Sequence, residues 1–129
     1  MTLAIGSQAP DFSVPNHDNI VRTLADYAGR YLVLYFYPKD DTPGCTREAI
    51  GFTKLANEFS DKQAVVVGVS ADSVASHQKF RDKHQLTVEL LADETKAVCQ
   101  AYGTNGCRGI SAHTISLQQQ DREVLPKTR

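Results

Sequence analysis

The feature that most constrains the fold is a pair of apolar runs on either side of a segment with helical periodicity. Residues 31–37 and 64–70 are rich in β-branched and aromatic side chains and have the length of buried strands. Between them, from residue 43 to about residue 59, apolar residues recur at the spacing of one helix face. These are Ala49, Phe52, Leu55, Ala56 and Phe59. A strand, a helix and a second strand in this order predict an α/β fold with parallel strands and a right-handed crossover.

The remaining segments predict further strands and helices. Residues 9–14 and 20–23, with a turn cluster between them, predict an N-terminal hairpin, and residues 24–28 predict a short helical turn. A helix capped by Asp72 or Ser73 should reach residue 84, and a strand at 88–91 and a helix at 93–103 should follow. Residues 113–117 and 123–125 predict a C-terminal hairpin. We expect the whole chain, residues 1–129, to form one domain.

Composition excludes several classes of function. The net charge of −1 gives no sign of a nucleic-acid partner, and the longest apolar run is too short to cross a membrane. No signal peptide is visible at the start, so we expect a cytoplasmic protein. The three cysteines include no Cys-x-x-Cys pair, and we expect neither a metal nor a cofactor. His77 and His84 could share a helix face, but without a nearby acidic or cysteine partner we expect both to be solvated.

Cys45 stands out because it lies in a predicted strand-to-helix turn, residues 36–46, where reactive groups of α/β folds are often found. Thr42 is a good N-cap residue and Pro43 suits the first helical position, which puts Cys45 at N3. There the positive end of the helix and unpaired N–H groups favour the thiolate. The alternative is that Cys45 is a small buried hydrophobe and that Pro43-Gly44 is only a turn signal.

The spacing of Pro38, Thr42 and Cys45 resembles the active-site signature of peroxiredoxins. The whole stretch 36–46 is similar to the peroxiredoxin Q branch, also called bacterioferritin comigratory proteins. The similarity continues through residues 67–73, 90–93 and 101–103, and covers the chain from about residue 6 to residue 103. It implies a thioredoxin-like fold preceded by a β-hairpin. Relative to that family, the C-terminus of this chain is shortened.

The resemblance also implies roles for the residues of the motif. Cys45 would be the peroxidatic nucleophile, which attacks hydrogen peroxide or an organic hydroperoxide and becomes a sulfenic acid. Thr42 would hydrogen-bond the thiolate or the peroxide, and the ring of Pro38 would shield the thiolate from water. The backbone N–H groups of Gly44 and Cys45 would donate to the substrate. Thioredoxin or another thiol would supply the electrons.

The C-terminal part departs from the family pattern. Family members carry an arginine that supports the thiolate, and here Ala112 occupies that position within residues 109–115. Arg108 is four residues away and is a possible substitute. A missing C-terminal helix would leave one sheet face partly uncovered, so we expect a monomer or a weak dimer.

The resolving cysteine is also displaced. Many relatives have it five residues after the peroxidatic one, where this chain has Ile50, and another branch has it near residues 80–81, where this chain has no cysteine. Two candidates remain. Cys107 lies in a glycine-containing loop beside Arg108, whereas Cys99 lies within a predicted helix and is expected to be part of the core. An external thiol is the third possibility.

Two alternative functions remain as hypotheses. The altered C-terminal segment favours a catalytically degraded peroxiredoxin fold with a binding or structural role, whereas the intact set of Pro38, Thr42 and Cys45 favours a thiol peroxidase. A dithiol oxidoreductase is disfavoured because a second cysteine of a Cys-x-x-Cys pair is missing.

Overall fold

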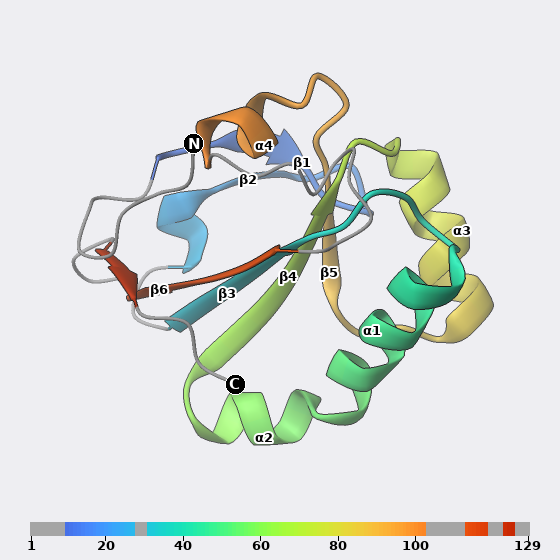
Figure 1. Ribbon diagram of the computed structural model, residues 1–129, viewed down its shortest axis with the longest axis horizontal. Coiled ribbons are helices and arrows are strands. Elements are labelled where there is room, and N and C mark those ends of the chain that lie inside the picture. The colour runs from blue at the N-terminus through green and yellow to red at the C-terminus, as the bar shows by residue number, and fades with distance from the viewer. Residues whose placement is uncertain (1–9, 28–30, 103–112, 119–122, 126–129) are drawn as a thin grey trace.

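A central sheet organises the computed structural model, which describes residues 10–27, 31–102, 113–118 and 123–125 (Figure 1). Within these residues, a five-stranded sheet has the order β5-β4-β3-β6-β7, and β1 and β2 form a separate hairpin. The strands are β1 (Ser13–Pro15), β2 (Val21–Thr23), β3 (Tyr31–Phe36), β4 (Ala64–Ser70), β5 (Glu89–Ala92), β6 (His113–Gln118) and β7 (Glu123–Leu125). The helices are η1 (Leu24–Tyr27), α1 (Pro43–Lys54), α2 (Ala56–Asp61), α3 (Val74–His84) and α4 (Ala97–Ala101).

The two apolar runs form the predicted parallel pair. β3 and β4 are parallel, in a register that places Tyr31 beside Ala64 and Phe36 beside Val69. β5 extends the sheet in parallel beyond β4, while β6 pairs antiparallel with β3 and β7 with β6. The C-terminal hairpin predicted from the sequence is therefore confirmed.

Each face of the sheet carries its own hydrophobic core because successive residues of a strand point to opposite faces. Leu32, Leu34 and Phe36 of β3 belong to a cluster with η1, α4 and Phe12. Tyr35, in the same strand, belongs to a second cluster with residues of α1 and α3. Figure 1 shows the same division, with α4 and the N-terminal hairpin on one side and α1 and α3 on the other.

The N-terminal hairpin is present but shorter than predicted, because its first strand is confined to β1 rather than occupying residues 9–14. The Asn16 side chain organises the turn, since its Oδ1 accepts from the N–H groups of Asp18 and Ile20. Its Nδ2 also donates to Glu89 of β5 at 2.7 Å, and Asn16 forms an antiparallel bridge with Leu91. The hairpin is thus joined to the outer side of β5.

The predicted single helix over residues 43–59 is wrong. Leu55 leaves helical geometry at φ −94° and ψ 7°, which separates α1 from α2. The change of direction puts Leu55, predicted to be buried, at 43% exposure, whereas Ala49 is fully buried. Leu55 is the exception on the predicted apolar face, because Phe52 of α1 and Phe59 of α2 are partly buried against the same core as Ala49.

The next two helices differ in how well the sequence predicted them. α3 begins as expected, with Ser73 as the N-cap and its hydroxyl accepting from the N–H of Ser76 at 3.1 Å. The helix predicted to open at Asp93 begins only at Ala97. The carboxylate of Asp93 instead turns forward and accepts from the N–H groups of Val98 and Cys99.

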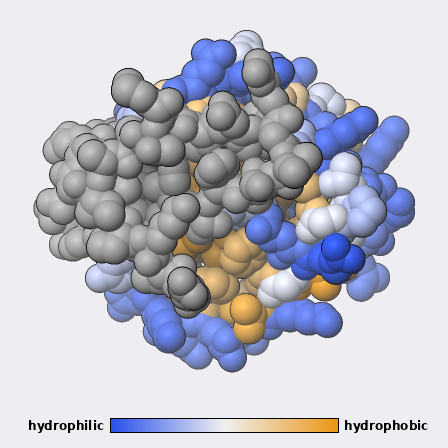
Figure 2. Space-filling model, in the orientation of Figure 1, coloured by the Kyte–Doolittle hydropathy of each residue, from blue (hydrophilic) through white to orange (hydrophobic). Residues whose placement is uncertain are grey.

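Hydrophilic residues form most of the described surface in Figure 2, and hydrophobic residues gather near the centre and lower part of that face. The exposed large hydrophobic residues among those described are Ile20, Val21, Tyr31 and Leu55. Among the described residues, no helix combines the length and hydrophobicity needed to cross a bilayer.

Candidate active site

Cys45 lies in the first turn of α1, directly after the loop that leaves β3. Its side chain packs in the α1/α3 core with Tyr35, Tyr37 and Ala49, and the residue is only 9% exposed. The thiol is free. A small opening toward solvent on an otherwise apolar wall suits a nucleophile that must meet a small substrate and exclude bulk water.

Thr42 occupies the N-cap position, with extended backbone angles of φ −86° and ψ 154°, but its side chain makes no capping bond. Its hydroxyl instead donates back to the carbonyl of Lys39 at 3.2 Å. The sequence-based expectation of a good N-cap therefore holds for the backbone and fails for the side chain. The hydroxyl proton of Thr42 is thus used within the loop that precedes the helix, in which Pro38 forms a bend.

The consequence is a pair of available donors at the start of α1. No described residue accepts a hydrogen bond from the backbone N–H of Gly44 or Cys45, and the first such bond of the helix is donated by Thr46 to the Thr42 carbonyl at 2.8 Å. Unpaired N–H groups and the helix dipole together favour negative charge at this end. Pro38, whose role is predicted to be the shielding of the thiolate, is half-buried in the loop before α1.

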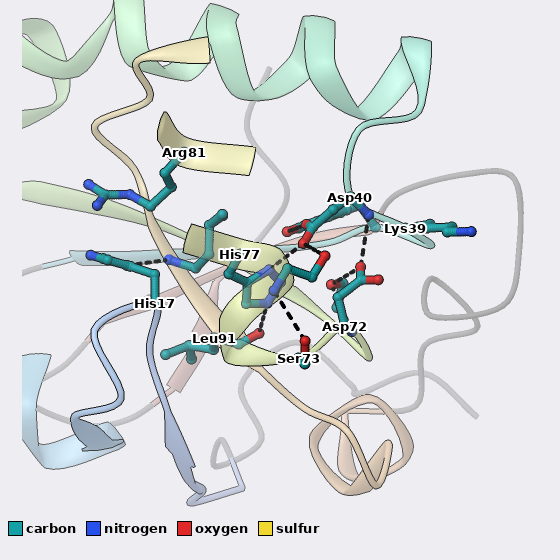
Figure 3. Close-up of polar contacts among 12 residues, drawn as sticks. His17, Lys39, Asp40, Asp72, Ser73, His77, Arg81 and Leu91 are labelled. Carbon is teal, nitrogen blue, oxygen red and sulfur yellow. Dashed lines mark hydrogen bonds and ion pairs between the residues drawn. The ribbon is translucent and has the colours of Figure 1, made fainter. Parts of the chain in front are cut away.

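The loop between β3 and α1 is fixed by Asp40, whose side chain is 4% exposed. Its Oδ1 accepts from the Tyr37 hydroxyl at 2.6 Å, and its Oδ2 accepts from the Ser76 hydroxyl at 2.8 Å. The same Oδ2 lies 2.7 Å from Nδ1 of His77, while the backbone N–H of Asp40 donates to Asp72. Figure 3 shows His77 between the loop and β5.

The expectation that His77 is solvated is wrong, because the residue is fully buried. His84 is partly solvated, with a side chain that is 21% exposed, but it does have an acidic partner, because its Nε2 lies 2.8 Å from Asp41. Their partners, Asp40 and Asp41, are 37 and 43 residues away in the chain, so no local sequence pattern predicts these contacts. The hydrogen-bonding requirement of a buried aspartate was the only available signal, and the sequence does not show which aspartate is buried.

Asp41 forms a second, exposed anchor for the same loop. It adopts a left-handed conformation at φ 61°, which an aspartate tolerates better than most residues. Its carboxylate accepts from Nζ of Lys83 at 2.7 Å. The hydrogen bonds from Lys83 and then His84 lower the pKa of Asp41. A groove of about 470 Å³ lies between this loop and α3, but Cys45 does not line it.

The structure separates Cys45 from one of the two internal candidates for a resolving cysteine. Cys99 lies in α4, is 2% exposed, belongs to the core on the opposite face of the sheet, and is disulfide-bonded rather than a free thiol. Cys107 lies outside the described residues, as do Arg108 and Ala112. Ile50 is half-buried beside the Cys45 core, at the position where many relatives carry their second cysteine. Among the described residues, no group of three or more His, Cys, Asp and Glu side chains is arranged to hold a metal.

Comparison with known proteins gives the class. The AhpC/TSA family profile matches residues 5–122. The putative peroxiredoxin bcp of Helicobacter pylori strain J99 is 51% identical over 106 residues, which cover 82% of this chain and 70% of that protein. Peroxiredoxin Bcp of Bacillus subtilis is 45% identical over 102 residues, covering 79% of this chain and 65% of that protein.

Solved structures agree with these sequence relatives. A cysteine-to-serine mutant of Xylella fastidiosa PrxQ is 31% identical, with a TM-score of 0.87 over 98% of this chain and 85% of that one. The bacterioferritin comigratory protein of Xanthomonas campestris, studied for its alkyl peroxide reduction activity, is 35% identical, with a TM-score of 0.80 over 89% of this chain and 78% of that one. The chain therefore belongs to the AhpC/TSA family, as a peroxiredoxin of the Bcp and Q type. It has the thioredoxin-like fold of that class and is a thiol-dependent peroxidase.

Proposed function

We propose that Cys45 is the peroxidatic residue and that the first turn of α1 is the peroxide site. The observation that supports this assignment most directly is a free, nearly buried thiol at N3, beside two backbone N–H groups for which no described residue is an acceptor. The thiolate sulfur attacks the terminal oxygen of the hydroperoxide, an S–O bond forms, and the O–O bond breaks. The leaving oxygen takes up the proton that the thiol released, which gives an alcohol or water, and Cys45 becomes a sulfenic acid.

The surrounding groups act on the charge that moves during this step. The N–H groups of Gly44 and Cys45 stabilise the negative charge on sulfur and oxygen. The Thr42 hydroxyl donates its proton to the Lys39 carbonyl, so its lone pairs are available to accept from the O–H of the peroxide. Pro38 limits the access of water to the thiolate. Ala112 replaces the family arginine, and Ala112→Arg should raise the rate if the backbone there follows the family path.

The substrates we propose are hydrogen peroxide and organic hydroperoxides, reduced in the cytoplasm by a monomer or a weak dimer. Alkyl peroxide reduction is studied in the Xanthomonas campestris relative, which supports the organic substrates. The reductant we propose is thioredoxin or another thiol. It displaces water from the sulfenic acid to form a mixed disulfide, and a second thiol then releases Cys45.

We propose the following order of candidates for resolution, in which the placement of Cys99 supports its last rank. An external thiol comes first, Cys107 second and Cys99 last. A disulfide requires the two Cα atoms to lie within about 7 Å of each other. Cys99 and Cys45 belong to cores on opposite faces of the sheet, so a bridge between them needs one core to open.

Mass spectrometry after one equivalent of peroxide, with no thiol added, tests the proposal. We expect oxidation at Cys45, trapped by dimedone as a sulfenic acid. Cys45→Ser should abolish peroxide consumption and keep the fold. Retained consumption in Cys45→Ser would refute the assignment. A folded wild-type protein that consumes no peroxide would instead favour the degraded fold with a binding role.

A further inference from the structure

His77 presents a problem of proton counting. Its side chain is fully buried, and each ring nitrogen faces an oxygen, Nδ1 at 2.7 Å from Asp40 Oδ2 and Nε2 at 2.9 Å from the carbonyl of Leu91 (Figure 3). A backbone carbonyl has no proton to give, so Nε2 must carry one. If Nδ1 carried none, a proton on Asp40 would have to fill the 2.7 Å contact.

The other partners of Asp40 decide where that second proton lies. The Tyr37 hydroxyl donates to Oδ1, and burial raises the pKa of Tyr37 well above its usual value, so the phenol keeps its proton. The Ser76 hydroxyl donates to the same Oδ2 that faces His77. A carboxylate oxygen has lone pairs for two donors, so Oδ2 of Asp40 can accept from the Ser76 hydroxyl and from an N–H at Nδ1 of His77. The arrangement therefore holds an imidazolium against a carboxylate.

We propose that His77 is a positioning residue for the peroxidatic loop and acts as an imidazolium clamped between Asp40 and the Leu91 carbonyl. The proposal rests on the assignment of Cys45 as the nucleophile. Asp40 lies two residues before Thr42 and five before Cys45, so holding its side chain fixes the point at which the chain enters α1. The clamp in this way places the N–H groups of Gly44 and Cys45 relative to β3.

The elements around the clamp make it rigid. Tyr37 directly follows β3, Ser76 and His77 come from α3, and Leu91 comes from β5. Asp72, which follows β4, accepts from the Asp40 backbone at 2.8 Å and from Ser70 at 2.7 Å. Figure 3 also labels the ionisable residues His17, Lys39 and Arg81, and Nε of Arg81 donates to the Val88 carbonyl. Asp40 thus bonds directly to residues that follow β3 and β4 and to residues of α3, and through His77 it is linked to β5.

His77→Gln and His84→Gln form a matched pair for the kinetic test. Both histidines lie on α3 and each contacts an aspartate of the same loop, but His77 is buried and His84 is partly exposed. We expect His77→Gln to lower the single-turnover rate constant for Cys45 with hydrogen peroxide about 10- to 100-fold, since a small misplacement of a reacting group has that scale. His84→Gln should change it by less than about twofold, because exposed ion pairs contribute little.

Three readouts separate positioning from a general loss of stability. Alkylation of Cys45 by iodoacetamide needs a thiolate and access but not the peroxide site, so in His77→Gln it should stay level or rise. Asp40→Asn should lower the peroxide rate constant to a similar extent, and the double variant should be no slower than either single variant. Heteronuclear NMR of the imidazole in the wild-type protein should show protons on both ring nitrogens of His77 at neutral pH.

The outcomes are distinguishable. If wild-type Cys45 reacts no faster with peroxide than free cysteine in solution does, the assignment of Cys45 fails. If wild-type Cys45 reacts quickly and folded His77→Gln reacts equally quickly, the positioning role fails. A neutral tautomer of His77 in the NMR spectrum overturns the imidazolium. If His77→Gln does not fold, Ser76→Ala replaces it in the kinetic test, because it removes one hydrogen bond to Asp40. An unchanged peroxide rate constant in Ser76→Ala would count against the clamp.

Discussion

The hydroxyl of Tyr35 is buried and finds no hydrogen-bond partner within the described part of the chain, and this leads to a prediction about stability. Tyr35 is 1% exposed and lies in β3 against the α1/α3 core. Burial raises the pKa of its phenol well above the ordinary value, so the group keeps a proton that it cannot donate. We therefore expect Tyr35→Phe to make the protein more stable.

The magnitude follows from two opposing effects. An unsatisfied buried hydroxyl costs about 1–3 kcal/mol. Removing the oxygen leaves a small gap and loses some dispersion contacts, which offset part of that gain. We expect a net increase of about 1 kcal/mol in the free energy of unfolding, or about 3–5 °C in Tm for a chain of this length.

Gly68 provides an independent check on the same oxygen. A Cβ built at Gly68 would lie 2.8 Å from both Cζ and the hydroxyl oxygen of Tyr35 and 2.9 Å from Cδ2 of Leu90. Gly68→Ala should therefore cost about 1–3 kcal/mol by overpacking. In the Tyr35→Phe background one of these clashes is gone, so the cost should fall by at least about 0.5 kcal/mol.

Urea unfolding of the wild type, Tyr35→Phe, Gly68→Ala and the double variant measures the stability gained in Tyr35→Phe and the reduced cost of Gly68→Ala in that background. Tyr37→Phe is the matched control because its hydroxyl donates to Asp40, and it should lower the stability by about 1.5–3 kcal/mol, the value of a bond to a charged group. The reasoning is refuted if Tyr35→Phe destabilises the protein as much as Tyr37→Phe does. That result would mean that the Tyr35 hydroxyl has a partner, such as an ordered water molecule.

Three shorter predictions concern Thr42, Ser73 and His17. Thr42→Val should lower the peroxide rate constant by about 1–3 kcal/mol of transition-state free energy and leave Tm almost unchanged, with Thr42→Ser as the control; equal rate constants would show that the hydroxyl takes no part. Ser73→Ala should cost about 1 kcal/mol of stability in urea unfolding through the lost cap of α3, and no loss would contradict that role. Burial lowers the pKa of His17 below its ordinary value of 6.5. The stability that neutral His17 contributes to the fold is therefore fully present above pH 6.5 and is lost as the pH falls through the pKa of His17 in the folded protein. His17→Gln should therefore flatten the decline in stability between about pH 7.5 and about pH 5.5, and an unchanged slope would count against it.

The sequence predicted those parts of the fold that depend on local patterns. The apolar runs of β3 and β4 specify buried parallel strands whatever surrounds them. Ser73 marks the start of α3 because its hydroxyl caps the helix by accepting from the N–H of Ser76. The N3 position of Cys45 was predicted for the same reason, because Pro43 and Thr42 define the start of a helix without help from distant residues.

Features that depend on distant partners were missed. The break at Leu55 is a change of chain direction that periodicity does not encode. The late start of α4 arises because the Asp93 carboxylate bonds forward to Val98 and Cys99. The burial of His77 requires Asp40, and neither residue shows in the sequence that the other is near.

The attachment of the N-terminal hairpin to β5 has a consequence for association between copies of the chain. β5 ends the order of the sheet, and an open edge strand is a template for pairing with a strand of another molecule. Asn16 occupies that edge at Leu91, and Nδ1 of His17 accepts the outward N–H of Leu90 at 3.4 Å. These two residues of the hairpin turn thus block the edge of β5 to pairing with a strand of another molecule. Contact between copies at this edge of the sheet would first require the hairpin to detach.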